Sequence, residues 1–141
     1  MGMNGMARGG DKRLWVQLVW ATRERERLIP PTLDEWLERM LTERCQQIGC
    51  TALAVGNASD HVHVLLAFRA SMPIATIAQE LKGPTSRALS ARIPRFGWQA
   101  GYYAETVGDA EALVDPVRRQ REHHEDSAPP ESWEAYFEPG A

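Results

Sequence analysis

The tetrapeptide Asp60-His61-Val62-His63 is the part of the sequence best suited to chemistry. The residues after it are apolar and often β-branched or aromatic, which predicts a strand from His61 to Phe68. Side chains in a strand alternate between two faces, so His61 and His63 share one face and a wholly apolar set occupies the other. Two neighbouring imidazoles are natural ligands for a metal ion. An incidental His-x-His pair in an exposed strand is the alternative interpretation.

A second stretch has the charge that phosphate binding needs. Between Leu81 and Ala104 there is no acidic residue, and the basic residues are Lys82, Arg87, Arg92 and Arg95. This stretch carries +4 although the net charge of the chain is −3. A chain built in this way can offer one basic surface to a nucleic-acid backbone. We expect Lys82 and Arg87 to be the best phosphate contacts, and a solvated helix face is the alternative.

These residues must be positioned by strands and helices that the pattern of apolar residues predicts. The predicted strands are Leu14–Ala21, Thr51–Val55, His61–Phe68 and Tyr102–Val107, and the predicted helices are Thr32–Ile48, Met72–Ile93 and Asp109–His124. Strands that alternate with helices and one hairpin indicate an α+β, ferredoxin-like two-layer sandwich. We expect an antiparallel sheet with helices on one face and the histidine pair on the other.

Two local patterns predict how the first helix begins and where the second helix bends or breaks. Thr32 and Glu35 form a capping-box pattern at the start of the first helix. Gly83-Pro84 lies inside the second helix, where a proline removes a hydrogen bond and should kink or break it.

The chain of 141 residues has the length of one domain. We predict a disordered N-terminus over residues 1–13, a folded domain over 14–126 and an acidic tail over 127–141. No apolar run is long enough to span a bilayer, and the N-terminus has no signal-peptide pattern, so we expect a cytoplasmic protein without a membrane partner. Cys45 and Cys50 match no zinc or redox motif, and Cys45 falls on an apolar helix face.

Asp-His-Val-His on the second strand of a hairpin resembles the HUH motif of the single-tyrosine transposases of small insertion sequences, which include the REP-associated tyrosine transposases. The resemblance continues through four further segments in the same order and spans about residues 14–124. These segments are Leu18-Val19-Trp20-Ala21-Thr22-Arg23, Leu81-Lys82-Gly83-Pro84-Thr85-Ser86-Arg87, Gly101-Tyr102-Tyr103-Ala104-Glu105-Thr106-Val107-Gly108 and Gln120-Arg121-Glu122-His123-His124.

The resemblance implies a site and an activity. By motif, His61, His63 and Gln120 correspond to the family's ligands of a divalent cation, Mg²⁺ or Mn²⁺, which polarises the scissile phosphate of single-stranded DNA. In the family a tyrosine one helical turn before the glutamine attacks and forms a covalent 5′-phosphotyrosine link. The resemblance also implies a DNA partner with a hairpin, a homodimer and a role in DNA transposition.

The sequence departs from the family at the nucleophile. The residue four before Gln120 is Pro116, and no tyrosine lies between Ala104 and Trp133. Asp115-Pro116 is a good pair for the start of a helix. We therefore predict that the last helix breaks near Val114 and restarts at Pro116.

Other residues could take part in place of the missing tyrosine. Tyr102 and Tyr103 alternate along a strand, so only one of them can face the metal, and packing or base stacking is the alternative role. Tyr136 could reach a site only if the tail folds back. His123 and His124 could approach the metal or a phosphate, and Trp20 and Trp98 could stack on bases or pack in the core.

Three functions remain open at this point. The first is a transposase-type enzyme that nicks and joins single-stranded DNA beside a hairpin. The second is a catalytically inactive or domesticated protein that still binds the hairpin. The third is a nuclease in which water replaces the tyrosine. A general RNA-binding sheet fits least, since the chain lacks an aromatic-rich recognition strand.

Overall fold

The computed structural model describes residues 13–125, with side chains as far as residue 122. In chain order the elements are β1 (Arg13–Ala21), η1 (Arg23–Arg25), η2 (Pro31–Leu33), α1 (Asp34–Gln47), β2 (Thr51–Asn57), β3 (His61–Arg69), α2 (Ile74–Ser90), β4 (Tyr103–Thr106), η3 (Glu111–Leu113), α3 (Val114–Arg118) and α4 (Gln120–Glu125), where η marks a 3₁₀ turn. The predicted strands and the first two predicted helices are present, with bounds shifted by a few residues, whereas the third predicted helix, Asp109–His124, is divided into η3, α3 and α4.

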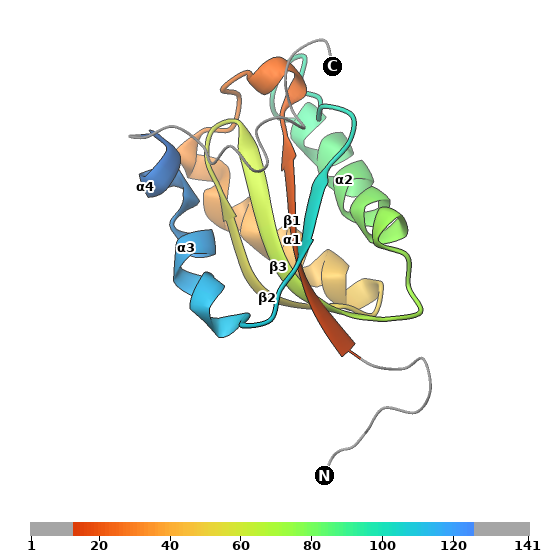
Figure 1. The fold of residues 1–141 in the computed structure, drawn as a ribbon. Helices are drawn as coiled ribbons and strands as arrows, with labels where there is room; N and C mark the ends of the chain where they lie inside the picture. Colours follow the sequence, from red (N-terminus) through yellow and green to blue (C-terminus); the bar gives the residue numbers. More distant parts are fainter. Residues whose placement is uncertain (1–12, 126–141) are drawn as a thin grey trace.

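The four strands form one antiparallel sheet in the order β2-β3-β1-β4 (Figure 1). His63 pairs with Val19 of β1 on one side and with Gly56 of β2 on the other. His61 pairs with Ala21. The succession β-α-β-β-α-β is that of a ferredoxin-like sandwich, so the predicted fold class is confirmed.

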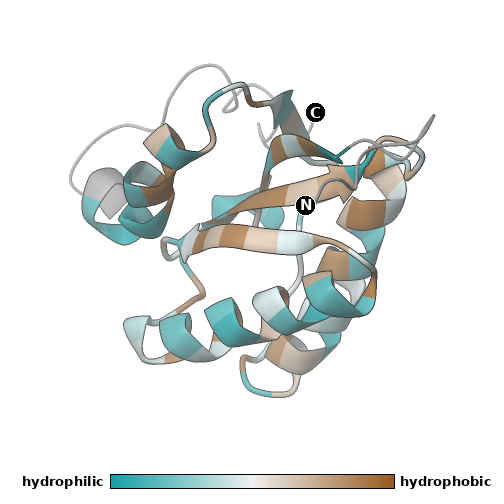
Figure 2. Cartoon of the chain, turned by 90° about the horizontal axis from the view of Figure 1, so that it is seen from below, coloured by the Kyte–Doolittle hydropathy of each residue, from teal (hydrophilic) through white to brown (hydrophobic). Residues whose placement is uncertain are grey.

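Apolar packing divides the helices between the two faces of the sheet. Leu37 and Leu41 of α1 and Ile77 and Leu81 of α2 join the main core with the apolar face of β3. A second, smaller cluster joins Val117 of α3 to Leu65, on the face that carries the histidines. Figure 1 shows α3 and α4 on the side of the sheet away from α2, and in Figure 2 the apolar colour concentrates on the strands between the helices. The expectation of helices on one face therefore holds for α1 and α2, whereas α3 and α4 cover part of the histidine face.

The predicted capping box at the start of α1 is wrong. The N-cap of α1 is Leu33, and no side chain caps the helix. Thr32 lies inside the η2 turn, which the Leu33 amide closes on the Pro30 carbonyl. An N-cap side chain needs an extended backbone at its own position, and the turn removes that conformation from Thr32.

The predicted break at Gly83-Pro84 is also wrong, since α2 runs from Ile74 to Ser90 with Pro84 inside it. Pro84 has no N–H for the carbonyl of Glu80, four residues earlier. Arg44 of α1 supplies the missing donor, because its Nε lies 3.1 Å from the Glu80 carbonyl oxygen. The Arg44 guanidinium also pairs with the Glu80 carboxylate. Contact between the two helices therefore compensates for the proline.

The C-terminal helical segment is interrupted, though not where predicted. Helix α3 begins at Val114 rather than Pro116, after the η3 turn. Pro116 stands in the first turn of α3, where the backbone N–H groups have no partner inside the helix, so the ring costs little. The interruption falls at Arg119, between α3 and α4.

The predicted bounds of the folded domain, residues 14–126, stay a prediction. Strand β1 begins at Arg13, one residue before the predicted start of the domain. The predicted disordered N-terminus and acidic tail, with Tyr136, fall outside residues 13–125. Within residues 13–125 no helix is both long and apolar enough to cross a membrane.

Candidate functional site

His61 and His63 project from β3 on the same face of the sheet, and their ring centroids are 5.1 Å apart. Both residues are buried, at 0% and 4% exposure. The Nδ1 of His61 lies 2.8 Å from Asp60 Oδ1, and the Nδ1 of His63 lies 2.8 Å from Gln17 Oε1. Since both oxygens accept, each Nδ1 donates a proton. In a neutral imidazole with this proton, Nε2 carries the lone pair that a metal ligand needs.

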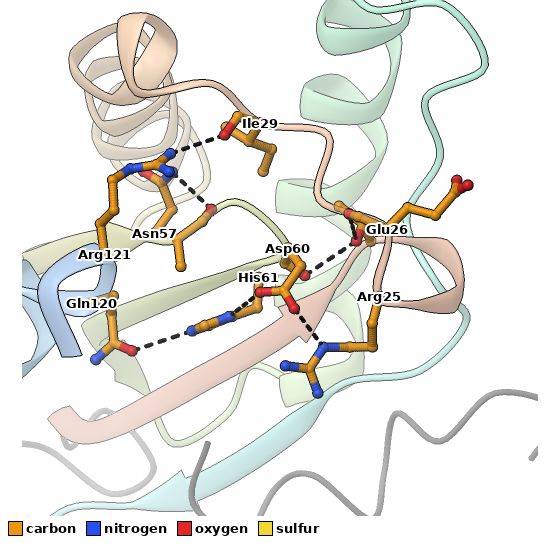
Figure 3. A network of polar contacts seen from close by, with 10 residues as sticks. Arg25, Glu26, Ile29, Asn57, Asp60, His61, Gln120 and Arg121 are labelled. Carbon is orange, nitrogen blue, oxygen red and sulfur yellow. Dashed lines mark hydrogen bonds and ion pairs between the residues drawn. The ribbon is translucent and has the colours of Figure 1, made fainter. Parts of the chain in front are cut away.

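Gln120, at the start of α4, brings an oxygen to this pair. Its Nε2 donates to the Pro116 carbonyl at 2.7 Å, which turns its Oε1 toward His61. The Oε1 lies 3.2 Å from His61 Nε2, and Figure 3 shows the two side chains pointing toward each other. Gln120 is only 5% exposed. The last helical segment and the sheet therefore place the Gln120 amide oxygen opposite a ring nitrogen of His61.

The separation of these two atoms fits a shared cation. Two ligand atoms at right angles, each about 2.1 Å from a small divalent ion, lie about 3.0 Å from each other. A proton on His61 Nε2, donated to Gln120 Oε1, would satisfy the same two atoms without a cation. Among the side chains that the structure describes, residues 13–122, no three of His, Cys, Asp or Glu gather as a metal site. The Gln120 amide oxygen could join the two histidines as a metal ligand, as the motif predicts.

Asp60 links His61 to Arg25. Arg25 Nε donates to Asp60 Oδ2 at 3.0 Å, and the other carboxylate oxygen accepts from His61. Burial raises the pKa of Asp60, but the hydrogen bonds and charge interactions with His61 and Arg25 outweigh it and hold that pKa below its usual value. The carboxylate is therefore ionised at neutral pH and is a strong acceptor for His61.

Helices α3 and α4 are held closely against the rest of the domain. A Cβ atom at Gly56 of β2 would lie 1.7 Å from the carbonyl oxygen of Val117, so the α3 backbone rests directly on this glycine. On α4, Arg121 donates through Nε and Nη2 to the two carboxylate oxygens of Asp34, each at 2.9 Å, and through Nη2 to the Ile29 carbonyl at 3.0 Å. These contacts determine where Gln120 stands.

Comparison with known proteins decides the family. The model of the IS200-like transposases matches residues 11–118, which is most of the chain. This chain belongs to the IS200-like transposase family. The matched residues include Pro116 and end before Gln120. No curated protein sequence matches this chain.

Two solved structures share the transposase fold. A candidate transposase from Deinococcus radiodurans R1 is 24% identical, with a TM-score of 0.67, and the match covers 80% of this chain and 94% of that one. A REP-associated tyrosine transposase bound to a REP hairpin is 14% identical, with a TM-score of 0.62, and the match covers 86% of this chain and 74% of that one. At these identities the likeness concerns the fold.

In this IS200-like transposase the two neighbouring tyrosines face opposite sides of the sheet, as the alternation predicted. Tyr103 pairs with Val19, and Val19 pairs with His63 on its other side. The three residues therefore form one cross-strand row, and Tyr103 lies on the face of the sheet that carries the histidines. Tyr102 lines a groove with Lys82 and other residues of α2, on the opposite face. Pro116 is exposed on α3 and has no group that could attack a phosphate.

The predicted DNA-binding residues lie on α2 and the loop after it, apart from the histidine pair. Lys82 Nζ donates to the carbonyls of Gln99 at 2.9 Å and Gly101 at 2.7 Å, and burial lowers the pKa of Lys82. Arg87, Arg92 and Arg95 are exposed. The guanidinium of Arg92 stacks on Trp36, 4.5 Å from the ring centroid. The role of these four residues in DNA binding stays a prediction.

The loop after α2 nevertheless returns to the end of the sheet where Asp60 and His61 lie. Trp98 pairs with Thr22, whose amide donates to the Asp60 carbonyl at 2.9 Å. Trp98 is largely buried and donates from Nε1 to the Thr85 hydroxyl at 3.0 Å. It also packs edge-to-face on the fully buried Trp20, with centroids 5.8 Å apart. Both tryptophans therefore pack in the core and do not offer a face for base stacking.

Some residues that shape the site were missed in the sequence. Gln17 is the one polar residue inside the apolar run of β1. It lies two residues before Val19, so strand alternation could have placed it on the same face of the sheet as Val19 and the histidines. Arg25, Gly56 and Arg121 gave no comparable signal, because their partners are distant in the sequence. The side chains of His123 and His124 lie outside the part that the structure describes, so their predicted approach to the site stays a prediction.

Proposed function

We propose that this chain binds hairpin-bearing single-stranded DNA and cleaves and joins it in DNA transposition with a divalent cation, Mg²⁺ or Mn²⁺. His61, His63 and Gln120 hold the cation. The observation that carries the proposal is the 3.2 Å separation of His61 Nε2 and Gln120 Oε1. Each of these atoms is turned toward the other by a hydrogen bond on the far side of its own side chain. A cation between these two buried atoms would satisfy both of them, as would a proton on His61 Nε2.

A divalent cation bound there supplies Lewis-acid polarisation of the scissile phosphate. The chain's own residues hold the geometry. The Nδ1 hydrogen bonds to Asp60 and Gln17 fix both imidazole rings, and β3 is an inner strand of the sheet. A site built on a rigid strand keeps its ligands in place better than a site built on loops.

The nucleophile is the part of the family's machinery that differs here. Pro116 stands where the family has tyrosine, so attack requires another hydroxyl. Tyr103 is our candidate because it shares the sheet face and the cross-strand row of His63. In that reaction the phenolic oxygen bonds to phosphorus, the bond from phosphorus to the 3′ oxygen breaks, and a 3′ hydroxyl leaves. The phenol proton passes to solvent.

The second candidate function is a catalytically inactive or domesticated hairpin-binding protein. Pro116 favours it, and so does the position of Tyr103, which is half-buried against apolar residues that include its strand neighbour Val19. Binding in either case needs a basic surface, which we place at Lys82, Arg87, Arg92 and Arg95. The last three are exposed, and phosphate contacts of this kind weaken as salt rises.

A cleavage assay tests the first candidate function against the second. Hairpin-bearing single-stranded DNA, labelled on either side of the nick, is incubated with the protein and Mg²⁺ or Mn²⁺ and run on denaturing gels. A covalent adduct that Tyr103→Phe removes and Tyr102→Phe retains supports attack by Tyr103. The Tyr102 variant is a matched control because it loses the same hydroxyl from the opposite face.

The other outcomes of the assay are equally informative. Cleavage without an adduct indicates that water attacks. Binding without cleavage supports the inactive hairpin binder, and Pro116→Tyr then tests whether activity returns. Cleavage that His61→Ala and Gln120→Ala leave unchanged contradicts the proposed cation site. Light scattering of the purified protein tests the homodimer that we also propose from the family.

A further inference from the structure

The turn after β1 has an unusual backbone. Glu24 and Arg25 both have φ of 57°, in the left-handed region that residues other than glycine rarely adopt. Such conformations persist only where the surroundings impose them, and they often mark functional positions.

Thr22 is the centre of the contacts that impose the turn. Its Oγ1 lies 2.6 Å from the Glu26 carbonyl and 3.2 Å from the Asp60 carbonyl, and its amide donates to the Asp60 carbonyl at 2.9 Å. The Arg25 amide donates to the Thr22 carbonyl at 2.9 Å. Thr22 is completely buried. The turn is therefore fastened to the backbone of Asp60, and it carries Arg25 toward the Asp60 side chain.

A continuous row of contacts runs from Arg25 to the candidate site (Figure 3). Arg25 Nε lies 3.0 Å from Asp60 Oδ2, and Asp60 Oδ1 lies 2.8 Å from His61 Nδ1. Arg25 thus occupies one carboxylate oxygen and His61 the other. Holding both oxygens leaves the Asp60 side chain one orientation, and in that orientation it accepts the Nδ1 proton of His61.

We infer that Arg25 is a positioning residue, which keeps His61 in the Nδ1–H tautomer by fixing the Asp60 carboxylate. His61 Nε2 then presents its lone pair toward Gln120. Without Arg25 the Asp60 side chain, which is 15% exposed, can turn to water and leave the His61 proton without its acceptor. The effect on cation binding rests on the proposed function, whereas the tautomer is a property of the protein alone.

Nitrogen NMR of the full-length protein, labelled with ¹⁵N-histidine and without added metal, tests the tautomer directly. The two ring nitrogens differ in shift according to which one carries the proton. We expect the Nδ1–H form of His61 in the parent protein and a mixture of tautomers in Arg25→Ala and Arg25→Met. The methionine variant keeps the aliphatic stem in case alanine unfolds the turn. Arg27→Ala is the control, because Arg27 is an exposed arginine two residues further along, and it should retain the parent spectrum.

Calorimetric titration with Mn²⁺ gives a second readout. Removing a group that orients a metal ligand typically weakens metal binding by about 10- to 100-fold, which we expect for both Arg25 variants and not for Arg27→Ala. A folded Arg25→Met protein with the parent tautomer and the parent affinity overturns the inference. A parent protein that shows the Nδ1–H tautomer but no Mn²⁺ binding overturns the proposed cation site and leaves the role of Arg25 in the tautomer intact.

Discussion

Replacing Gly56 by alanine is the most direct test of how α3 and Gln120 are placed. Gly56 pairs with His63 across the sheet, and the backbone of α3 crosses over it. The substitution adds a single methyl group to β2 and leaves every proposed ligand unchanged. We expect a loss of cation binding to come mainly from a movement of the helical segment that carries Gln120, because the nearest atoms to the new methyl group belong to α3.

The size of that movement follows from the distances. The new Cβ would lie 1.7 Å from the Val117 carbonyl oxygen, whereas ordinary contacts begin near 3.4 Å. The obstacle is backbone rather than a flexible side chain, so α3 must retreat by about the 1.7 Å difference. Metal sites tolerate deviations of only about 0.2 Å in ligand distance. Overpacking of this kind also costs about 1–3 kcal/mol of folding free energy.

The assay is Mn²⁺ titration together with thermal unfolding. We expect Gly56→Ala to bind Mn²⁺ at least tenfold more weakly and to melt several degrees lower than the parent protein. Gly108→Ala is the matched control, because a Cβ there meets nothing within 4 Å. A Gly56→Ala protein with the parent melting temperature and the parent Mn²⁺ affinity would refute the close contact between α3 and β2 and the placement of Gln120 that depends on it.

Two further predictions concern the stability and the reactivity of the core. Arg44→Ala should lower the free energy of unfolding by about 1 kcal/mol more in the parent protein than in a Pro84→Ala background. In that background the N–H of the new alanine can donate to the Glu80 carbonyl that Arg44 now satisfies. A double-mutant cycle from urea unfolding measures this, and additive effects of the two substitutions would contradict the compensation. Burial raises the pKa of the Cys45 thiol to about 12 and raises that of Cys50, so at about pH 8 neither should react with iodoacetamide in the folded protein. Mass spectrometry should find both labelled after unfolding, and rapid labelling of the native protein would show that the cysteines are accessible.

Local rules account for what could be predicted of the fold. The period-two alternation of β3 and the helical spacing of α1 identified those elements, and their order in the chain indicated the ferredoxin-like sandwich. The failures have a common origin in contacts that are distant in sequence. Pro84 does not break α2, because Arg44 from another helix satisfies the carbonyl that the proline leaves. Thr32 does not cap α1, because it lies inside the η2 turn and lacks the extended backbone conformation of an N-cap residue.

The sequence by itself determined the family, the shared face of His61 and His63 and the absence of tyrosine at Pro116, because motif order, strand alternation and residue identity need no knowledge of the fold. Only the tertiary structure decided that the Gln120 oxygen meets the His61 nitrogen and that Tyr103 rather than Tyr102 shares their face. It also decided that the α3 backbone packs directly on Gly56 and that Arg25 donates a hydrogen bond to Asp60. These contacts depend on how closely β2, α3 and the turn after β1 approach one another. A local pattern of residues does not specify the distances between elements that are far apart in the sequence.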